Sequence, residues 1–136
     1  MLTQAQFNCA SKRHTDLAET ESASKTNKQC ADLSSTNLQN AILKETELQE
    51  ANFTGANLTS ANLSQANLSN ANLTGADFSR AILFKTDMRE TNLTTSQLLG
   101  KISPKLCETK LPTNISTDID TNRDCGLMND LMQTNP

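Results

Sequence analysis

A large apolar residue recurs at every fifth position over half of this 136-residue chain. The series begins at Leu33 and keeps its phase without a break to Leu98. Its fourteen members, called here the central residues, are Leu33, Leu38, Leu43, Leu48, Phe53, Leu58, Leu63, Leu68, Leu73, Phe78, Leu83, Met88, Leu93 and Leu98. A period of five fits neither an α-helix nor a β-strand, whose side chains return to one face every 3.6 and every 2 residues. The chain must therefore bend in another way to bring these side chains into one core.

The residues around each central residue repeat as well. Ala, Thr or Ser stands two positions before it, and Asn or Asp stands directly before it in ten of the fourteen repeats, so that the unit reads Ala-Asn-Leu-Ser/Thr-x. Only 35% of the chain is apolar, which is too little to fill a core of ordinary cross-section. A chain that turns a corner at every fifth residue closes a four-sided coil of about 20 residues, and stacked coils lie about 4.8 Å apart as parallel ladders. We therefore predict an all-β solenoid, a parallel β-helix of about four coils.

The repeat resembles that of the pentapeptide-repeat family. The resemblance rests on the in-phase units between Ala31 and Gly100, about half of the chain. Members of that family fold as right-handed quadrilateral β-helices, so the resemblance implies this fold here. Gly55 and Gly75 each end a repeat, one coil apart, and are expected at the positive-φ corner of a type II turn.

Both ends of a solenoid expose backbone groups and core side chains, so caps are expected there. We predict three segments: an N-terminal cap at 1–30, the β-helix at 31–100, and a partial last coil with a C-terminal cap at 101–136. In the N-terminal cap, residues 16–26 carry a capping box and are predicted to form a short helix. A loop that covers the first coil is the alternative for the N-terminal 29 residues.

In the C-terminal segment the apolar series resumes at Leu106 and Leu111, three residues out of register, after a kink at Pro104. This indicates one more partial coil. A polar loop over 112–124 then leads to a short amphipathic helix over 127–132. The apolar residues that this helix is expected to lay over the last coil are Leu127, Leu131 and Met128.

Four cysteines lie outside the regular repeats: Cys9, Cys30, Cys107 and Cys125. An even number, with one pair beside each end, predicts two disulfides that pin the caps, Cys9–Cys30 and Cys107–Cys125. The run from Leu106 to Pro112, followed by Cys125, also resembles the C-terminal cap of cyanobacterial and plastid members of the family, several of which are exported to the periplasm or the thylakoid lumen. We therefore expect an exported protein whose leader is absent from the sequence given. Four reduced thiols in a cytoplasmic protein are the alternative.

The residue inventory offers no catalytic or metal site. The single histidine, His14, lies in a polar stretch, and the cysteines lack Cys-x-x-Cys spacing. Glu45, Glu47 and Glu50 are close in sequence, but the corners of the coil spread them over two faces. A net charge of −3 gives no basic footprint for nucleic acid, and no apolar stretch is long enough to span a membrane. We expect no enzyme activity, no cofactor, no nucleic-acid partner and no membrane insertion.

The exposed positions of the repeats indicate where a protein partner would bind. Between Ala51 and Gly75 no residue is charged. Ile42 and Ile82 replace Asn or Asp before their central residues, two coils apart on one face, and Phe84 lies on the same face. These three apolar residues form the candidate partner surface. An end segment of the chain that folds back over them is the alternative.

We therefore expect a non-enzymatic structural or protein-interaction module in an oxidising compartment, with a monomer favoured although the sequence leaves the oligomeric state open. The alternative function is taken from the family resemblance. Certain bacterial members resemble duplex DNA in shape and charge, bind type II topoisomerase and confer quinolone resistance. Such mimicry needs rows of carboxylates on a long rod, whereas this chain has about four coils and an uncharged middle.

Overall fold

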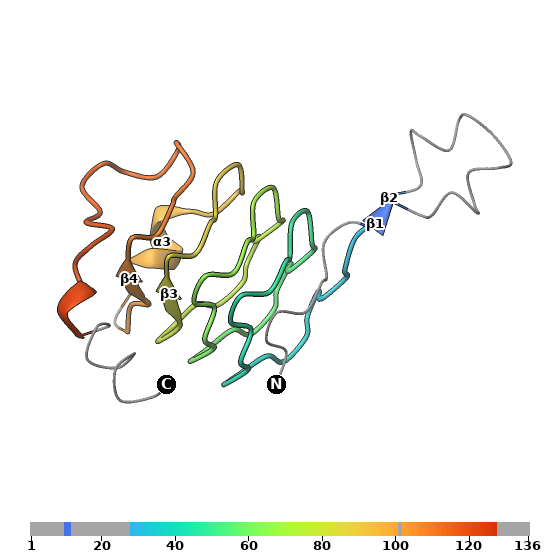
Figure 1. The fold of residues 1–136 in the computed structure, drawn as a ribbon, viewed down its shortest axis with the longest axis horizontal. Coiled ribbons are helices and arrows are strands. Elements are labelled where there is room, and N and C mark those ends of the chain that lie inside the picture. The colour runs from blue at the N-terminus through green and yellow to red at the C-terminus, as the bar shows by residue number, and fades with distance from the viewer. Residues whose placement is uncertain (1–9, 12–27, 101, 128–136) are drawn as a thin grey trace, which may run out of the picture.

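The computed structural model describes residues 10–11, 28–100 and 102–127. Successive coils stack side by side along one axis, and the C-terminal segment lies beyond the last coil, at the opposite end from β1 and β2 (Figure 1). The named elements are the strands β1 (Ala10–Ser11), β2 (Lys28–Gln29), β3 (Ile82–Phe84) and β4 (Lys105–Cys107) and the helix α3 (Thr95–Leu98). Strands β1 and β2 pair antiparallel, and β3 and β4 pair parallel.

Single parallel bridges, rather than long strands, hold neighbouring coils together. In the described part of the chain, eight of these bridges join residues 20 positions apart, such as Asp32 to Asn52 and Asn52 to Asn72, with two bridges on each of four sides. Backbone hydrogen bonds run in both directions between coils: the Leu33 N–H donates to the Asn52 carbonyl (2.7 Å), and the Asn52 N–H donates to the Ala31 carbonyl (2.9 Å). A coil therefore has four sides of five residues each.

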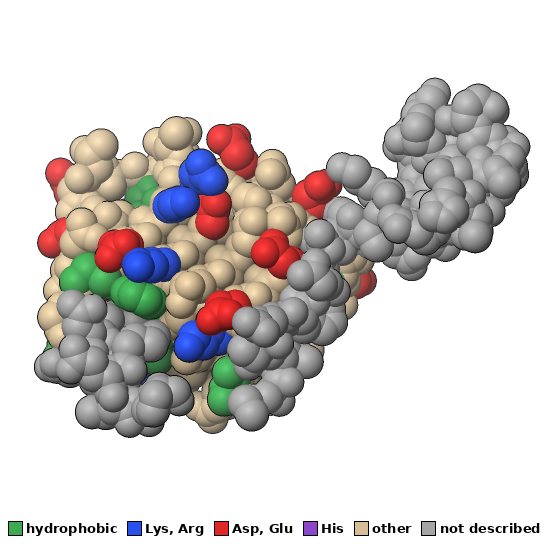
Figure 2. Space-filling view, viewed as in Figure 1, with side chains coloured by type: hydrophobic (Ala, Val, Ile, Leu, Met, Phe, Trp, Pro, Cys, Tyr) green, Lys and Arg blue, Asp and Glu red, His purple; other side chains and the backbone are tan. Residues whose placement is uncertain are grey.

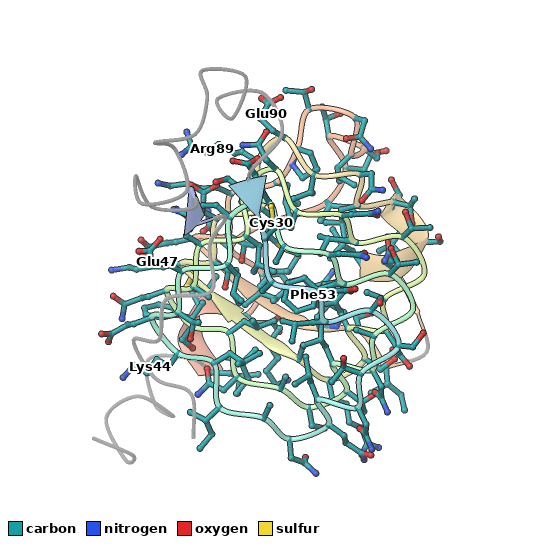
Figure 3. The ribbon with its side chains drawn as sticks, turned by 90° about the vertical axis from the view of Figure 1, so that its right-hand side faces the viewer. Cys30, Lys44, Glu47, Phe53, Arg89 and Glu90 are labelled. Atoms are coloured by element: carbon teal, nitrogen blue, oxygen red, sulfur yellow. A yellow bond between two sulfur atoms is a disulfide. The ribbon has the colours of Figure 1, made fainter. Side chains whose placement is uncertain are left out.

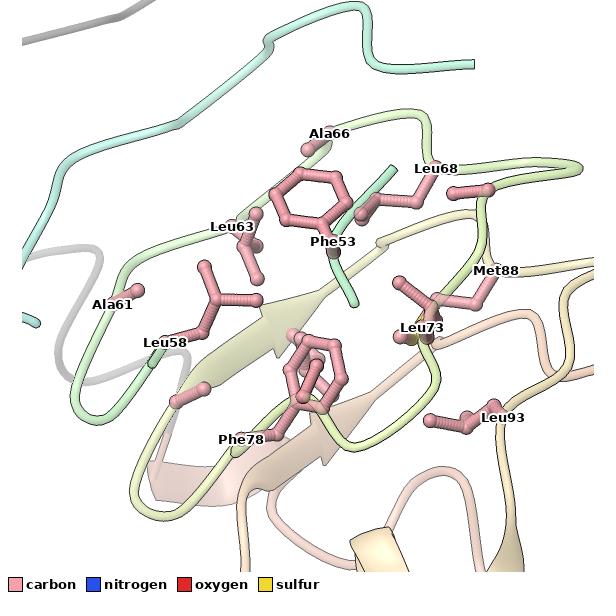
Figure 4. Packing of buried hydrophobic residues seen from close by; sticks show 14 of the residues in the cluster. Phe53, Leu58, Ala61, Leu63, Ala66, Leu68, Leu73, Phe78, Met88 and Leu93 are labelled. Carbon is pink, nitrogen blue, oxygen red and sulfur yellow. The ribbon is translucent and has the colours of Figure 1, made fainter. Parts of the chain in front are cut away.

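The central residues fill the interior of the stack. From Leu43 onward they are all buried, with at most 1% of each side chain exposed, as are the alanines between Ala51 and Ala81. Along the axis, Phe53 lies inside the coil whereas Lys44 and Glu47 lie outside it (Figure 3), and the buried side chains pack in a continuous cluster (Figure 4). Each buried leucine contributes about 1.5–3 kcal/mol. The first coil is less well covered: the list of partly buried apolar residues packed against the core is Ala31, Leu33, Leu38, Ala41 and Leu111.

The last residue of each repeat turns the corner. From Ser35 to Glu90 this residue has a positive φ, between 54° and 69°, at every repeat. The next N–H donates to the carbonyl of the central residue, as Ala56 N–H does to Phe53 O (2.9 Å). This is the pattern of a type II turn, with the positive φ at its third residue. The expectation for Gly55 and Gly75 holds, and the same geometry extends to the other residues at this position.

Replacing Gly75 by Ala is expected to cost about 1 kcal/mol, because an L-residue at positive φ is disfavoured. A Cβ at Gly75 would meet the backbone of Gly55 only at ordinary contact distance (3.8 Å to N), so the cost is conformational rather than steric. Urea unfolding measures it. The matched control is Gly100→Ala, where an added Cβ meets no atom within 4 Å. An equal loss in both variants would contradict the role of the turn.

The regular ladder ends on the side that carries α3. Here side chains replace the backbone partners of the previous coil: the Leu73 N–H donates to Asn92 Oδ1 (2.6 Å). The Gln97 Nε2 donates to the carbonyls of Leu73 (2.8 Å) and Ala76 (2.9 Å). Leu93 and Leu98 nevertheless stay buried in phase with the repeats. The sequence analysis did not predict this helix.

Coiling resumes after α3 with a shifted register. Strand β4 pairs with β3 so that Leu106 lies opposite Leu83 and Cys107 opposite Phe84. The separation is 23 residues instead of 20, which is the three-residue shift predicted from the apolar series. Leu106 is buried and Leu111 is partly buried against the core.

The segment predicted to be only a polar loop, 112–124, supplies two buried apolar side chains. Ile115 and Ile119 are each 8% exposed and belong to the core cluster. Tight turns place both of them, because the Ile115 N–H donates to the Pro112 carbonyl and the Ile119 N–H to the Ser116 carbonyl. Leu127 is 56% exposed, so the prediction that it covers the last coil is wrong.

Several predictions fall on parts of the chain that the structure does not describe. These are the helix over 16–26, most of the N-terminal cap, Met128, Leu131 and the helix over 127–132 beyond Leu127. His14 also lies outside the described residues.

Candidate interaction surface

One side of the solenoid carries all three residues of the predicted partner surface. It is formed by the repeats 41–45, 61–65 and 81–85 and is called here the isoleucine face. Bridges join Ile42 to Asn62 and Asn62 to Ile82, so the two isoleucines lie two coils apart in one column. Phe84 belongs to the same strand, β3, as Ile82.

The three apolar side chains differ in exposure. Ile42 is 39% exposed, whereas Ile82 and Phe84 are partly buried. The ammonium of Lys85 lies 5.2 Å from the centre of the Phe84 ring, a cation–π contact. Ser64, which occupies the Phe84 position one coil earlier, is fully buried. The face therefore has apolar groups on its first and third coils and a recessed polar residue between them.

Two ion pairs lie on this face. The Lys44 ammonium is 4.0 Å from a Glu45 carboxylate oxygen, and the Lys85 ammonium is 3.8 Å from Glu108. Both pairs are substantially exposed, so each adds little to the stability of the fold. Their charges remain close to the surface, where they can influence the approach of a partner.

The asparagines of the repeats hold turns and are not arranged as a ligand site. Asn62 Oδ1 accepts hydrogen bonds from the Ser64 N–H (3.0 Å) and hydroxyl (2.6 Å), and Asn72 does the same with Thr74. Such Asx turns are a local property of Asn or Asp followed two residues later by Ser or Thr. The sequence contained this signal, but the sequence analysis treated the Asn only as part of the motif.

Comparison with known proteins identifies the repeat. The model of the family described as "Pentapeptide repeats" matches eight copies at residues 31–70 and 61–98, which together span 31–98, or 68 of the 136 residues. The chain belongs to the pentapeptide-repeat family. Its fold is accordingly a right-handed β-helix. No curated protein has a sequence that matches the chain.

Three solved structures illustrate the relatives of this pentapeptide-repeat protein. Rfr23 from the cyanobacterium Cyanothece 51142 is 41% identical over 67% of this chain and 52% of its own, with a TM-score of 0.46. A pentapeptide-repeat protein from the Arabidopsis thaliana thylakoid lumen is 28% identical (72% and 70% covered, TM-score 0.25). QnrB1, a plasmid-mediated fluoroquinolone resistance protein, is 20% identical (80% and 48%, TM-score 0.48). The chain thus spans about half of Rfr23 and QnrB1, and these similarities carry no argument about function.

Acidic residues of this pentapeptide-repeat protein do not form continuous rows. On the side next to the isoleucine face, the column of Glu47 continues with the neutral Asn67 and then Asp87. The Arg89 guanidinium lies 2.6 Å from Asp87 and, with its hydrogen bond, lowers the pKa of that carboxyl. The side of the molecule in Figure 2 shows acidic and basic groups interspersed among neutral ones. In the described part of the chain, no group of three or more His, Cys, Asp or Glu is placed to hold a metal ion.

Asp77 gives the fold a measurable pH dependence. Its carboxylate accepts hydrogen bonds from the Ser79 hydroxyl (2.6 Å) and N–H (2.9 Å), and these bonds lower the pKa of Asp77 below its ordinary value of 3.8. A lowered folded-state pKa contributes stability above the ordinary value, and this stability is lost as the pH falls through the folded pKa. We expect Asp77→Asn, which restores the usual repeat residue, to lose less stability between about pH 7 and about pH 3 than the unchanged chain in urea unfolding. An equal loss would contradict this role.

The disulfide at the C-terminal end joins Cys107 of β4 to Cys125, with a Cα–Cα distance of 4.8 Å. Beside it, the Asp124 N–H donates to the Leu106 carbonyl (3.0 Å), and the Leu106 N–H donates to Asp124 Oδ2 (2.9 Å). Cys30 is also in a disulfide, and Cys9 lies outside the described residues. Among the described residues, no helix is long and apolar enough to cross a membrane.

Proposed function

We propose that this pentapeptide-repeat protein is a non-enzymatic module that binds another protein through the isoleucine face. The observation that carries the proposal is the alignment of Ile42 and Ile82 in one column, with Phe84 beside Ile82. The repeat otherwise places Asn or Asp and Ser or Thr at these positions, so the apolar residues are not required by the fold. Apolar groups gathered on one face of a soluble domain mark an interaction site.

Affinity capture from the native compartment, followed by mass spectrometry, tests this proposal. The variant to compare carries Ile42→Asn, Ile82→Asn and Phe84→Thr, which restores the repeat consensus and should keep the fold. The matched control carries Asn57→Ile, which adds an apolar residue to a different side of the same solenoid. We expect the consensus variant to lose partners that the unchanged chain and the control both retain. Retention of the same partners by the consensus variant would contradict the proposal.

We further propose that 31–100 forms a quadrilateral β-helix of about four coils, with 1–30 and 101–136 as its caps. The burial of Ile115 and Ile119 against the core supports a capping role for the C-terminal segment. Open ends of a solenoid need such covers, because they expose core side chains and unpaired backbone groups.

An oxidising compartment, such as the thylakoid lumen or the periplasm, is part of the proposal. The disulfide between Cys107 and Cys125 and the bonded state of Cys30 support it. Titration of the native protein with a thiol reagent is the test. We expect no reactive thiol before reduction and four after it. Four reactive thiols in the protein as isolated from its own compartment would contradict an oxidising location.

Mimicry of duplex DNA is the competing function, and the charge pattern supports it less well. Neutral Asn67 and Asn70 separate the acidic residues of the first and third coils on the side that carries Glu47. A gyrase supercoiling assay distinguishes the two proposals. We expect no inhibition at high micromolar protein, and inhibition at low micromolar protein would favour the competing function.

A further inference from the structure

We propose that the isoleucine face also binds a second copy of this chain, in a symmetric dimer whose two-fold axis runs along the middle coil of the face. The inference rests on the proposed function, because it assigns a partner to the same surface. It follows from how side chains on the first and third coils of the face complement one another across the neutral second coil.

The face consists of three columns, each with one residue from each coil. The first column is Ile42, Asn62 and Ile82, as the bridges show. By the same separation of 20 residues, the second column is Lys44, Ser64 and Phe84, and the third is Glu45, Gln65 and Lys85. In each column a neutral polar residue separates two larger groups.

A two-fold axis that lies in the interface, parallel to 61–65 of both copies, keeps each column opposite itself and reverses the order of the coils. Ile42 then faces Ile82 of the second copy. Lys44 faces Phe84 of the second copy, which sets a cation against an aromatic ring. Glu45, already beside Lys44 in its own chain, faces Lys85 of the second copy and adds an attraction between opposite charges.

The same operation on the neighbouring side of the solenoid gives the opposite result. That side consists of 46–50, 66–70 and 86–90, and it would place Glu47 against Asp87 and Glu50 against Glu90. Like charges in direct opposition suppress association. Self-complementarity is therefore a property of the isoleucine face and does not follow from the repeat alone.

The dimer is expected to be transient. The first and third coils of the face are about 10 Å apart, at two ladder spacings, and so small a face buries less area than a stable interface needs. A dilute sample is therefore monomeric, in agreement with the monomer favoured from the sequence, and association grows with protein concentration.

Disulfide trapping tests the symmetry directly. Asn62 lies on the proposed axis and faces its own counterpart, so an Asn62→Cys chain should cross-link to itself. Ile42→Cys and Ile82→Cys should each cross-link poorly alone but readily when the two proteins are mixed. The amide at this position is dispensable, since Ile42 and Ile82 replace it in the flanking coils. The matched control is Asn52→Cys, at the same repeat position on the adjacent side.

Under mild oxidation at high protein concentration, we expect Asn62→Cys to form covalent dimer about tenfold faster than Asn52→Cys, because a preformed dimer raises the local thiol concentration. Non-reducing electrophoresis and intact mass measure the product. Equal rates for the two variants, or cross-linking of Ile42→Cys alone as fast as in the mixture, would overturn the dimer. The capture experiment above is independent, so a failed cross-link leaves binding of a different protein through this face intact.

Discussion

Replacing Leu58 by Ala is expected to lower the free energy of unfolding by about 3 kcal/mol, because it removes buried methyl groups and leaves a cavity that the narrow coil cannot close. Leu58 is fully buried on the second coil, with covered neighbours above and below it in its column. Urea or thermal unfolding followed by circular dichroism measures the loss. Two-state behaviour should be checked, since repeat arrays can unfold in parts.

Leu38→Ala is the matched control for this prediction. Leu38 occupies the same column one coil earlier, but it is only partly buried at the end of the stack. We expect it to cost about 1 kcal/mol, since less apolar surface is lost and the site is already open. If Leu38→Ala destabilised the protein as much as Leu58→Ala, the gradient of burial along the solenoid axis would be wrong.

Removing the Cys107–Cys125 disulfide is expected to cost about 3 kcal/mol for its loop of 18 residues. The double variant Cys107→Ser and Cys125→Ser should lose protection from hydrogen exchange around β4 and around Ile115 and Ile119, where the disulfide holds the segment against the last coil. A loss of 3 kcal/mol corresponds to a decrease in protection of about 100-fold for amides that exchange by opening of this segment.

The middle coils provide the internal control for the disulfide variant. Amides between Asn52 and Asp77 belong to the regular ladder and do not contact the disulfide loop, so their protection should change much less. Reducing the unchanged protein should reproduce the effect on the C-terminal segment. Unaltered exchange in that segment would show that its backbone contacts, such as those between Leu106 and Asp124, suffice without the disulfide.

The fold could be predicted from the sequence to the extent that one repeat determines one side of the coil. A turn at each fifth residue directs Leu58 and Leu63 to the same interior, so their spacing was sufficient evidence for the coil. The later shift in register could also be read, because Leu106 and Leu111 keep the period of five after the break. No pairing of distant residues had to be guessed, since the separation of 20 follows from four equal sides.

The end of the regular ladder could not be predicted in the same way. Leu93 and Leu98 keep the phase, so the sequence predicts another regular side, yet the chain forms α3 there. The difference depends on Gln97, whose longer amide reaches two carbonyls of the previous coil. Periodicity reports which side chains are buried, but it does not report which groups accept the last hydrogen bonds.

The candidate surface was only partly visible in the sequence. The placement of Ile42 and Ile82 on one face followed from the period, because their separation is two full coils. Their different exposure did not follow, since it depends on neighbours from outside the repeat, such as β4 beside β3. For the same reason Ile115 and Ile119 went unrecognised: the turns that bring them to the core have no period.

The central claim is that residues 20 apart lie side by side in parallel ladders. Nuclear Overhauser contacts between backbone protons in solution test it most directly. We predict contacts between residues 20 apart from Asp32 to Asp87, such as Asn57 with Asp77, and contacts 23 apart between β3 and β4. Contacts confined to residues three and four apart, as in a helix, or a ladder with any other separation would contradict the claim.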